Sequence, residues 1–580
     1  MPPCPAPDLV PALLDRYDRD PGNLLQILIE IQEACHCVPG PAMAALGRAL
    51  CPGDRLRIPA LVDFYSFLSA DYLGDYVIRL SDNITDQMLG SRALMDQLGD
   101  RLRLAPGQTR ADGRVSLHFA SCIGMADQGP AALVNGRTVT RLDRDRVGRM
   151  AELIESGTPL ADWPGDWFRV EPNLRRCDAL LRPPLEPGAA IRACLERGAA
   201  ATLEEIERSG LRGRGGAGFS TARKWQAARA HPAPLRHILC NADEGEPGAF
   251  KDRLLLQSYP DLVIEGMTVA ALAVGARSGR IYLRGEYRFL GEHLAQVLAR
   301  RRAAGLLGGR ILGADLAFDI QLHWGAGAYI CGMETAMIES LEGRRGIPRR
   351  KYPLPVAAGY QGRPSVVNNV ETFAAAAQIG RHGGAGFARQ GTRDSTGTKL
   401  FSVSGDCARP GIYEYPWGIS CRELLRDCGA RDSAFLQVGG PSGNTVPEPE
   451  FDRRMGFEDL GGVGTVMVFD RSRRPLDMTR NFARFFQHEC CGLCTPCRLG
   501  TTLLVDLLEK FEAGRGSPAD LEEIRGLAAV MANLSHCGLG ATAPLHFLQV
   551  MAQFPEALAI AGPDFQPAPS SGVEPPLRGD

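Results

Sequence analysis

The sequence has little excess charge and no long hydrophobic run, and these absences narrow the class of protein. Its 580 residues carry 65 basic and 67 acidic side chains, a net charge of −2. This balance gives no reason to expect binding to nucleic acid or to an anionic membrane surface. No apolar run is long enough to span a bilayer. The N-terminus lacks the basic region and apolar stretch of a secretory signal, so we expect a cytoplasmic protein.

Cysteine is also sparse for a chain of this length. The 17 cysteines are too few for a disulfide scaffold, and most lie singly, as Cys51, Cys177 and Cys194 do. A small buried apolar role is the expectation for each single one. The segment CCGLCTPCR is the exception, because it gathers four cysteines between Cys490 and Cys497.

The spacing in this segment predicts a metal cluster. Three thiols follow the pattern C-x2-C-x2-C, which lets them converge on one [4Fe-4S] cubane, and a remote cysteine in SHCGLG supplies a fourth. The expected ligands are Cys491, Cys494, Cys497 and Cys537. Zinc uses the same ligand types but more often pairs two C-x2-C knuckles. Cys490 is expected to pack, and His536 is an alternative to Cys537 as a ligand.

A glycine-rich block, LRGRGGAGFSTARKW from Leu211, forms the second signal. Gly213, Gly215 and Gly218 satisfy G-x-G-x-x-G, but the preceding LEEIERSGL is amphipathic and helical. A dinucleotide fingerprint needs a strand there, so this is not an ordinary Rossmann start. The loop still leads into a helix near Thr221, whose free N–H groups and positive end suit an anion. Taken alone, such a loop is more often a plain turn.

Two polar blocks strengthen the prediction of a nucleotide site. The segment CNADEGEPGAFKDR follows the glycine loop and contains Asn241, Asp243, Glu244 and Glu246. Carboxylates suit ring N–H groups, ribose hydroxyls or a nicotinamide amide rather than phosphate. A second block, residues 325–372, brings glycines together with Glu334, Lys351, Asn368 and Asn369. We therefore expect the two blocks to form two walls of one pocket.

Helical and strand periodicities predict an α/β multidomain chain. The first unit is an N-terminal helical bundle and the second a thioredoxin-like domain, and a central α/β domain carries both glycine blocks. The last two units are a small β-grasp-like domain and a C-terminal helical iron-sulfur domain. The expected boundaries are 1–74, 75–160, a linker at 161–187, 188–395, 396–450, 451–562 and a disordered tail at 563–580.

The two signals suit one activity. An iron-sulfur cluster moves single electrons, whereas a pocket with carboxylates and amides suits a cofactor that moves two. Flavin converts between them, because it accepts a hydride and releases electrons one at a time. The sequence therefore predicts a flavin between a nucleotide pocket and the cluster.

The motifs RGRGGAGF, CNADEGEPGAFKDR, GAGAYICG, VNNVETF and CGLCTPCR give the chain a family resemblance. It resembles the flavin-bearing, NAD(H)-reactive subunits of respiratory complex I, NAD-dependent formate dehydrogenases and NAD-reducing nickel-iron hydrogenases. The hydrogenase diaphorase subunit is the best match, because a thioredoxin-like domain ending in a segment like CIGMADQGPA also precedes its flavin domain.

The resemblance implies the site residues. The FMN contacts of the family fall on Gly213, Arg214, Gly215, Lys224, Asn241, Asp243, Glu244, Tyr329, Gly332, Glu334, Asn368, Asn369 and Thr372. Positions around the nicotinamide dinucleotide match Phe219, Glu246 and Lys351, and Gly216 and Gly218 complete the loop. We expect no catalytic acid or base, because hydride passes directly between nicotinamide and flavin.

Three departures from the family pattern stand out. The four cysteines that hold a [2Fe-2S] cluster in the related free-standing protein correspond to Ser81, Asp86, Cys122 and Ala126. We therefore expect no [2Fe-2S] cluster in the N-terminal domain. Leu354 replaces an aromatic residue that stacks on the dinucleotide, with Tyr352 nearby, and Met333 stands where an acidic residue is usual.

The favoured function is hydride exchange between NAD(H) and FMN, with electrons passing through the [4Fe-4S] cluster to partner subunits. The chain contains no nickel-site cysteine pairs, so hydrogen chemistry would reside in a nickel-iron partner reached through an iron-sulfur subunit. The equivalent subunit of complex I or of a formate dehydrogenase is the alternative within this class. A non-enzymatic iron-sulfur sensor or scaffold is the alternative of another class, but it leaves both glycine blocks without a role.

Overall fold

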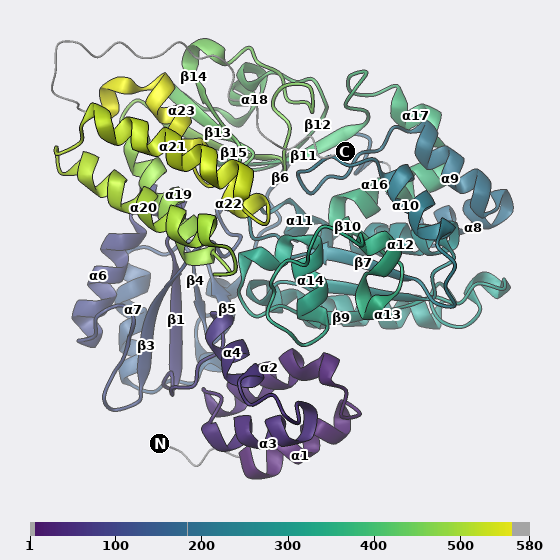
Figure 1. Cartoon of the computed structure of the whole chain (residues 1–580), viewed down its shortest axis with the longest axis horizontal. Helices are drawn as coiled ribbons and strands as arrows, with labels where there is room; N and C mark the ends of the chain where they lie inside the picture. Colours follow the sequence, from purple (N-terminus) through teal and green to yellow (C-terminus); the bar gives the residue numbers. More distant parts are fainter. Residues whose placement is uncertain (1–5, 183, 559–580) are drawn as a thin grey trace.

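The computed structural model of the chain describes residues 6–182 and 184–558. Figure 1 shows a helical N-terminal part beside a sheet that contains β1 and β3, with a larger α/β body next to both. The C-terminal helices α19 to α23 lie together over the top of the first sheet (Figure 1). The tail expected at 563–580 lies outside the described residues.

The N-terminal helices pack against one another and against the central domain. Their bounds are α1 Ala6–Arg16, α2 Leu24–Cys35, α3 Gly40–Leu50 and α4 Arg57–Phe64. The buried side of α2 shares one apolar core with residues of the central and C-terminal parts. The Gln26 amide donates to the Trp324 carbonyl at 2.9 Å and accepts from the Trp324 N–H at 3.1 Å. These two bonds fix the bundle to β9, residues Asp319–Trp324, which is an edge strand of the central sheet.

The thioredoxin-like part is a five-stranded mixed sheet in the order β2-β3-β1-β4-β5. Its strands are β1 Tyr76–Ser81, β2 Gln108–Thr109, β3 Val115–Ala120, β4 Ala132–Val134 and β5 Arg137–Val139. Its helices are α5 Ile84–Met88, α6 Ser91–Leu102 and α7 Arg144–Glu155. The apolar side chains of β1, β3 and β4 form one core with those of α6 and α7.

The central domain is built on a four-stranded sheet in the order β10-β7-β8-β9, in which every pairing is parallel. The strands are β7 His237–Ala242, β8 Ser278–Leu283, β9 Asp319–Trp324 and β10 Ser365–Asn369. The surrounding helices are α8 Ala189–Arg197, α9 Ala199–Arg208, α10 Thr221–Ala230, α11 Lys251–Ser258, α12 Pro260–Val274, α13 Gly291–Ala303, α14 Glu334–Leu341, α15 Pro355–Ala358, α16 Val370–His382 and α17 Gly384–Ala388. The nearly continuous apolar sequences of α12 and β7 match their burial on all sides.

A six-stranded sheet, β14-β13-β15-β11-β12-β6, differs from the expected domain boundaries. Its strands are β6 Leu174–Arg176, β11 Thr398–Gly405, β12 Gly411–Pro416, β13 Ser433–Val438, β14 Asn444–Pro447 and β15 Thr465–Asp470, and α18 Cys421–Cys428 accompanies them. The expected linker thus contains a strand, and the part expected to be helical from residue 451 begins with one. The reason is the apolar segment TVMVFD at 465–470, which pairs with β11 and β13 and is fully buried except for Asp470.

The C-terminal part after this strand is helical, as the periodicity predicts. It comprises α19 Pro475–Glu489, α20 Thr495–Glu512, α21 Pro518–Leu534, α22 Gly538–Thr542 and α23 Leu545–Gln553. None of the helices within residues 6–182 and 184–558 combines the length and apolarity needed to cross a membrane.

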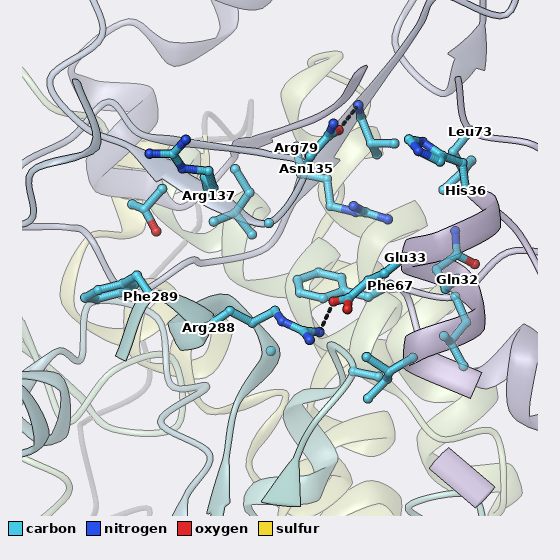
Figure 2. Close-up of a pocket in the computed structure, with 18 of the residues that line it drawn as sticks. Gln32, Glu33, His36, Phe67, Leu73, Arg79, Asn135, Arg137, Arg288 and Phe289 are labelled. Carbon is cyan, nitrogen blue, oxygen red and sulfur yellow. Dashed lines mark hydrogen bonds and ion pairs between the residues drawn. The ribbon is translucent and has the colours of Figure 1, made fainter. Parts of the chain in front are cut away.

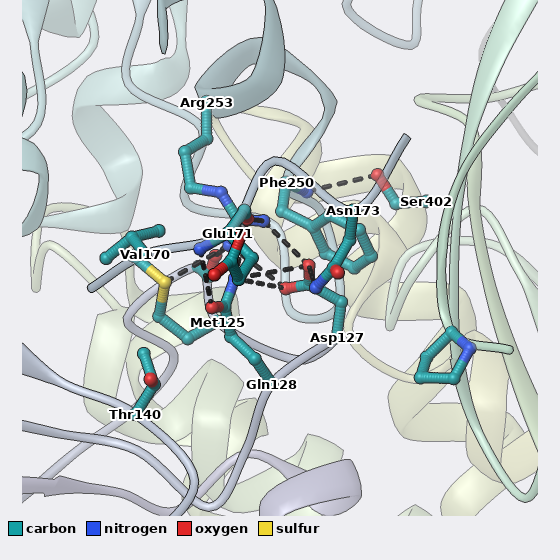
Figure 3. Close-up of polar contacts among 12 residues, drawn as sticks. Met125, Asp127, Gln128, Thr140, Val170, Glu171, Asn173, Phe250, Arg253 and Ser402 are labelled. Atoms are coloured by element: carbon teal, nitrogen blue, oxygen red, sulfur yellow. Dashed lines mark hydrogen bonds and ion pairs between the residues drawn. The ribbon is translucent and has the colours of Figure 1, made fainter. Parts of the chain in front are cut away.

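A buried ion pair joins the thioredoxin-like part to the central domain (Figure 3). Arg253 at the start of α11 donates to both carboxylate oxygens of Asp127, at 3.0 and 2.8 Å, and to the Gly124 carbonyl at 2.7 Å. Asn173 of the expected linker donates to the same carboxylate at 2.7 Å. Both charged side chains are fully buried. The CIGMADQGPA segment is therefore the contact that docks one domain on the other.

Candidate functional site

The predicted site residues gather at the carboxyl ends of the central parallel strands. Asn241 is the penultimate residue of β7 and lies in register with Asn369, which ends β10. The Asn241 amide donates to the Gly332 carbonyl at 2.6 Å, which brings the second glycine block to the same edge. Ligands of open parallel sheets bind at this edge. The expectation that both blocks face one place agrees with these contacts.

The glycine loop directly precedes α10, and backbone contacts between its two ends close it. Arg212 pairs with Ser220, and the Gly213 N–H donates to the Phe219 carbonyl at 2.9 Å. Gly218 has a φ of +65°, and a Cβ there would lie 2.4 Å from the Phe457 ring. Only glycine meets both conditions. The backbone of the loop is therefore held in one shape, close to the first N–H groups of α10.

Side chains from three elements hold the loop against the sheet edge. The Arg214 N–H donates to the Thr372 hydroxyl at 2.9 Å, which joins the loop to the first turn of α16. Lys224 on α10 forms an ion pair with Glu334 at the start of α14 and donates to the Val367 carbonyl at 3.0 Å. The starts of α10, α14 and α16 are thus tied together. Their dipoles favour an anion at this place.

Several buried polar atoms in this region have no partner in the described structure. Among them are Arg214 Nε and Asp243 Oδ2. Burial lowers the pKa of Arg214 to about 10 and raises the pKa of Asp243 well above its usual range. A ligand that both accepts and donates hydrogen bonds would satisfy these atoms, and a flavin with its phosphate does both.

Glu246 lies beside Tyr329 and completes the acidic part of the site. The Tyr329 hydroxyl donates to Glu246 Oε2 at 2.6 Å, and the Ser442 N–H donates to Oε1 at 3.3 Å. Burial raises the pKa of Glu246 to about 7. The carboxyl is therefore fixed in orientation. Ser442, from the turn between β13 and β14, is a contact that the sequence did not predict.

The carboxylate of Glu244 is engaged with the protein itself. Its carboxylate accepts from the Asp252 and Arg253 N–H groups at 2.9 and 3.1 Å and from the Tyr287 hydroxyl at 2.9 Å. The side chain thus caps the N-terminus of α11 inside the core, where burial raises its pKa to about 7. The physical reason is that α11 begins within the same motif and has free N–H groups there. The role of Glu244 in flavin binding stays a prediction.

A buried cluster of charges beneath Asn369 was missed by sequence reasoning. Lys251 donates to Asn369 Oδ1 at 3.1 Å and pairs with Asp252 at 2.7 Å and with Glu371 at 3.2 Å. Lys399 also pairs with Glu371. Burial alone would raise the pKa of Glu371, but the lysines and Arg214 lower it. The sequence does carry a signal for this cluster, because the charged triplet KDR at 251–253 stands directly before the apolar residues 254–256.

The rim of the site exposes large side chains. Phe219 is 48% exposed, and Tyr352, Leu354 and Met333 are exposed as well. Lys351 is exposed, with its ammonium 5.9 Å from the Tyr352 ring centroid. Within the described residues no hydrogen bond or ion pair joins Lys351 to the other predicted residues. Exposed aromatic faces of this kind suit stacking against a planar ring.

The four predicted cluster cysteines line one small cavity. Cys491, Cys494, Cys497 and Cys537 share it with Cys490, His536 and the apolar Ile330. No set of three or more His, Cys, Asp or Glu side chains in the described parts of the chain is arranged to hold a single metal ion. A convergent set of thiols in apolar surroundings fits the donor chemistry of an iron-sulfur cluster.

Cys490, which was expected to pack, and His536, the alternative ligand, have defined positions. The Cys490 sulfur lies 3.3 Å from that of Cys497 and accepts from the Gly492 N–H, and the contact with Cys497 lowers the pKa of Cys490 to about 6. His536 Nε2 lies 3.0 Å from the Pro348 and Arg349 carbonyls, and its backbone N–H points at Cys494. The His536 ring is thus engaged with the central domain.

The 3-10 turn Tyr329–Gly332 lies between the two sites. Tyr329 and Gly332 contact Glu246 and Asn241, whereas Ile330 lines the cysteine cavity. The Tyr329 N–H also donates to Glu489, the residue before Cys490, at 2.9 Å. One short turn therefore connects the pocket at the sheet edge with the thiols.

Family models match three segments of the chain. Residues 206–378 match the Nuo51 FMN-binding domain, and residues 477–560 match the NADH-ubiquinone oxidoreductase-F iron-sulfur binding region. Residues 10–155 match the thioredoxin-like [2Fe-2S] ferredoxin model. The matched segments contain the glycine loop, the sheet edge and all the cysteines of the cavity. The fold and the site thus define an oxidoreductase of the FMN-binding, iron-sulfur class.

The chain belongs to the family of flavin subunits of NAD-reducing hydrogenases. It is 40% identical to the NAD-reducing hydrogenase HoxS subunit alpha of Cupriavidus necator over 94% of this chain and 93% of that protein. A subunit of the NADH-quinone oxidoreductase of Rhizobium meliloti is 42% identical over 58% of this chain and 83% of its own. A crystal structure of an air-oxidized NAD+-reducing [NiFe]-hydrogenase superposes with a TM-score of 0.89, at 39% identity and 95% coverage of both chains.

The expectation of no [2Fe-2S] cluster in the N-terminal domain was wrong by this comparison. The match to the thioredoxin-like [2Fe-2S] ferredoxin model covers the whole domain and points to such a cluster. The expectation rested on four positions, whereas the match rests on the pattern of the entire segment. In the structure Ser81 donates to Asp86 at 2.6 Å, and Cys122 is buried.

Proposed function

We propose that the chain exchanges hydride between NAD(H) and FMN at the edge of the central sheet. Electrons then pass singly through a [4Fe-4S] cluster on Cys491, Cys494, Cys497 and Cys537. The observation that carries this proposal is the turn Tyr329–Gly332, which contacts the predicted pocket on one side and the cysteine cavity on the other. A path for single electrons needs such closeness between the two groups.

The protein residues bind and orient. The loop backbone and the starts of α10, α14 and α16 would hold the flavin phosphate, while Asn241, Asn369 and Asp243 would meet polar atoms of the flavin. Phe219 would stack on a ring of the dinucleotide, and Glu246 would hold an amide or ribose hydroxyl. Bound FMN supplies hydride acceptance and single-electron release, and the cluster supplies single-electron transfer. No side chain is required as an acid or base.

The partners follow from the relatives. The chain aligns over nearly its full length with a subunit of an NAD-reducing hydrogenase and with a chain of a solved NAD+-reducing [NiFe]-hydrogenase. We therefore place it in a cytoplasmic hetero-oligomer with an iron-sulfur electron-transfer subunit and nickel-iron subunits. Copurification with hydrogen-dependent NAD reduction distinguishes this complex from a complex I or formate dehydrogenase assembly.

Gly215→Trp tests the pocket. A Cβ at Gly215 already lies 3.3 Å from Asn369 Cβ, so an indole there would fill the space between the loop and the sheet edge. We expect the variant to lose the structured flavin absorption in the blue and its NADH-dye activity, while it keeps the iron-sulfur absorption. The measurement is the absorption spectrum of the anaerobically purified protein before and after NADH.

Gly309→Trp is the matched control. It lies in the same domain, and nothing stands within 4 Å of a Cβ at that position. We expect this variant to bind FMN as the wild type does. Retention of FMN and of NADH-dye activity in Gly215→Trp would contradict the pocket assignment. A wild-type protein that has intact iron but neither contains flavin nor reacts with NADH would contradict it as well.

A further inference from the structure

A cavity of about 560 Å³ lies where the N-terminal helices, the thioredoxin-like sheet and the central domain meet. Figure 2 shows Glu33 of α2, Arg79 of β1, and Arg288 and Phe289 of the central domain around it. Its volume lies within the range of small-molecule sites. It contains none of the residues predicted to bind FMN, NAD(H) or the cluster.

Arg79 is an unusual residue for its position. It occupies the middle of β1, the central strand of its sheet, between His118 on β3 and Leu133 on β4. Its guanidinium lies 4.8 Å from the Phe67 ring centroid and lines the cavity. No hydrogen bond or ion pair with another described residue satisfies it. Burial lowers the pKa of Arg79 to about 10, so the group remains charged at neutral pH.

The other charges around the cavity leave it positive. Arg288 is paired with Glu33, the only carboxylate in the described lining. The Arg137 guanidinium lies 3.7 Å from the Phe168 ring centroid and, among the residues that the structure describes, donates one hydrogen bond, to the Leu160 carbonyl at 3.1 Å. The described lining therefore carries three arginines and one carboxylate. Glu286, which also acts electrostatically on Arg79, is itself paired with Arg284. A cavity of this charge favours an anion.

The lining also offers a free hydroxyl and aromatic faces. Thr138 is 2% exposed, and its hydroxyl has no partner in the described structure although it borders the cavity. Phe67 and Phe289 lie on the walls, as Figure 2 shows. Buried polar atoms without a partner are rare and call for a ligand or water. Aromatic walls favour a planar ligand.

We propose that this cavity binds a planar aromatic anion, a carboxylate or a phosphate, with Arg79 as its anchoring cation. A guanidinium pairs with either group through two parallel hydrogen bonds. The ligand would contact three parts of the chain at once and would stabilise their docking. A second cavity of about 250 Å³ shares Arg79 and Phe67 and extends to Asp243 and Tyr329, so the site lies next to the predicted flavin pocket.

Equilibrium dialysis of the full chain with its cofactors tests the proposal. The probes are 1-naphthyl phosphate and 1-naphthoate, which lack the nucleotide parts that a dinucleotide pocket recognises. Naphthalene-1-carboxamide is the uncharged comparison. We expect at least one anion to bind, with the carboxamide at least about tenfold weaker. Binding of the phosphate alone or of the carboxylate alone identifies which group the site takes, and either result supports the proposal.

Arg79→Met should weaken binding of the anion by at least about tenfold, because the anchoring charge is removed. Arg149→Met is the control, since Arg149 lies on the outer side of α7 in the same domain, paired with Glu152. Thr138→Val, which keeps the side-chain shape, should also weaken binding and serves if Arg79→Met does not fold. The proposal fails if neither anion binds at about 10 mM, or if the folded Arg79→Met binds as the wild type does. If Arg79→Met does not fold, equal affinity of Thr138→Val and of the wild type for the anion would overturn the proposal.

Discussion

Glu371 is the charge on which the buried cluster beneath the sheet edge depends. It is fully buried and pairs with both Lys399 and Lys251. Burial lowers the pKa of Lys399 to about 7, although Glu371 opposes the shift. Buried pairs of this kind contribute little net stability while they are intact, but loss of one partner leaves a charge without compensation. The cluster should therefore respond strongly to single substitutions.

Lys399→Met should destabilise the central domain by about 3 to 5 kcal/mol, because it removes one of the partners of a buried carboxylate. The measurement is the urea concentration at which flavin fluorescence appears as FMN is released. The double variant Lys399→Met with Glu371→Gln removes one charge of each sign, so we expect it to be more stable than the single variant. A single variant as stable as the wild type would show that Glu371 is not charged in the native state.

Individual site residues were predictable where chemistry and spacing coincide. Motif spacing predicted that the four cysteines would converge, and they line one cavity, although their role as cluster ligands stays a prediction. The two polar blocks predicted that Asn241 and Asn369 would lie close together, and they are in register on neighbouring strands. Glu244 was not predictable, because its carboxylate has two possible targets, a ligand and the free N–H groups of α11, and only packing decides between them. Lys399 lies in a different part of the sequence, so its pairing with Glu371 has no local signal.

At the scale of the element, the last helix of the cluster domain has a pH-sensitive contact. His546 on α23 stacks on Phe486 of α19, with ring centroids 5.9 Å apart and planes 2° apart. Both ring nitrogens are buried without a partner in the described structure. Burial lowers the pKa of His546 from 6.5 to about 3. The helix pair is therefore joined by a neutral imidazole.

Acid should loosen this helix pair between pH 6.5 and about 3. In that window the unfolded chain binds a proton that the native chain does not, so stability falls by up to about 1.4 kcal/mol for each unit of pH. His546→Leu should remove this loss. The check is hydrogen exchange of α23 amides at pH 7 and pH 5. His488 is an exposed histidine on α19, so His488→Leu is the control and should show the pH dependence of the wild type. If His546→Leu also kept the pH dependence of the wild type, the assignment to His546 would be wrong.

Most elements were predictable from periodicity, and the exceptions are short. β6 has three residues, and the strand with which it pairs, β12, lies more than 230 residues away. β15 is a short apolar segment that lies inside the part predicted to be helical, residues 451–562. Its neighbours β11 and β13 come from the small domain, so the pairing that identifies it as a strand is long-range.

For the whole molecule, the contact of Arg253 with Asp127 decides how the domains dock. Asp127→Asn keeps the shape of the side chain but leaves the Arg253 guanidinium buried without a counter-charge. We expect a loss of about 3 to 5 kcal/mol in docking and faster proteolysis within 157–188. Limited proteolysis of the native protein measures it. Asp145→Asn, exposed on α7 of the same domain, is the control, and equal cleavage of both variants would contradict the docking role.

The six-stranded sheet has a practical consequence for anyone who trims this protein. Its strands come from the segment before the central domain, from the small domain, and from the start of the helical cluster domain, and β15 lies inside the sheet between β11 and β13. A shortened gene that stops before residue 465 deletes this inner strand. The edges of β11 and β13 would then be unpaired and prone to aggregation. A fragment that keeps this sheet intact must therefore begin upstream of Leu174 and run past Asp470. Removal of the cluster helices would also expose apolar surface, because α19 and α23 share a core with β13 and β15.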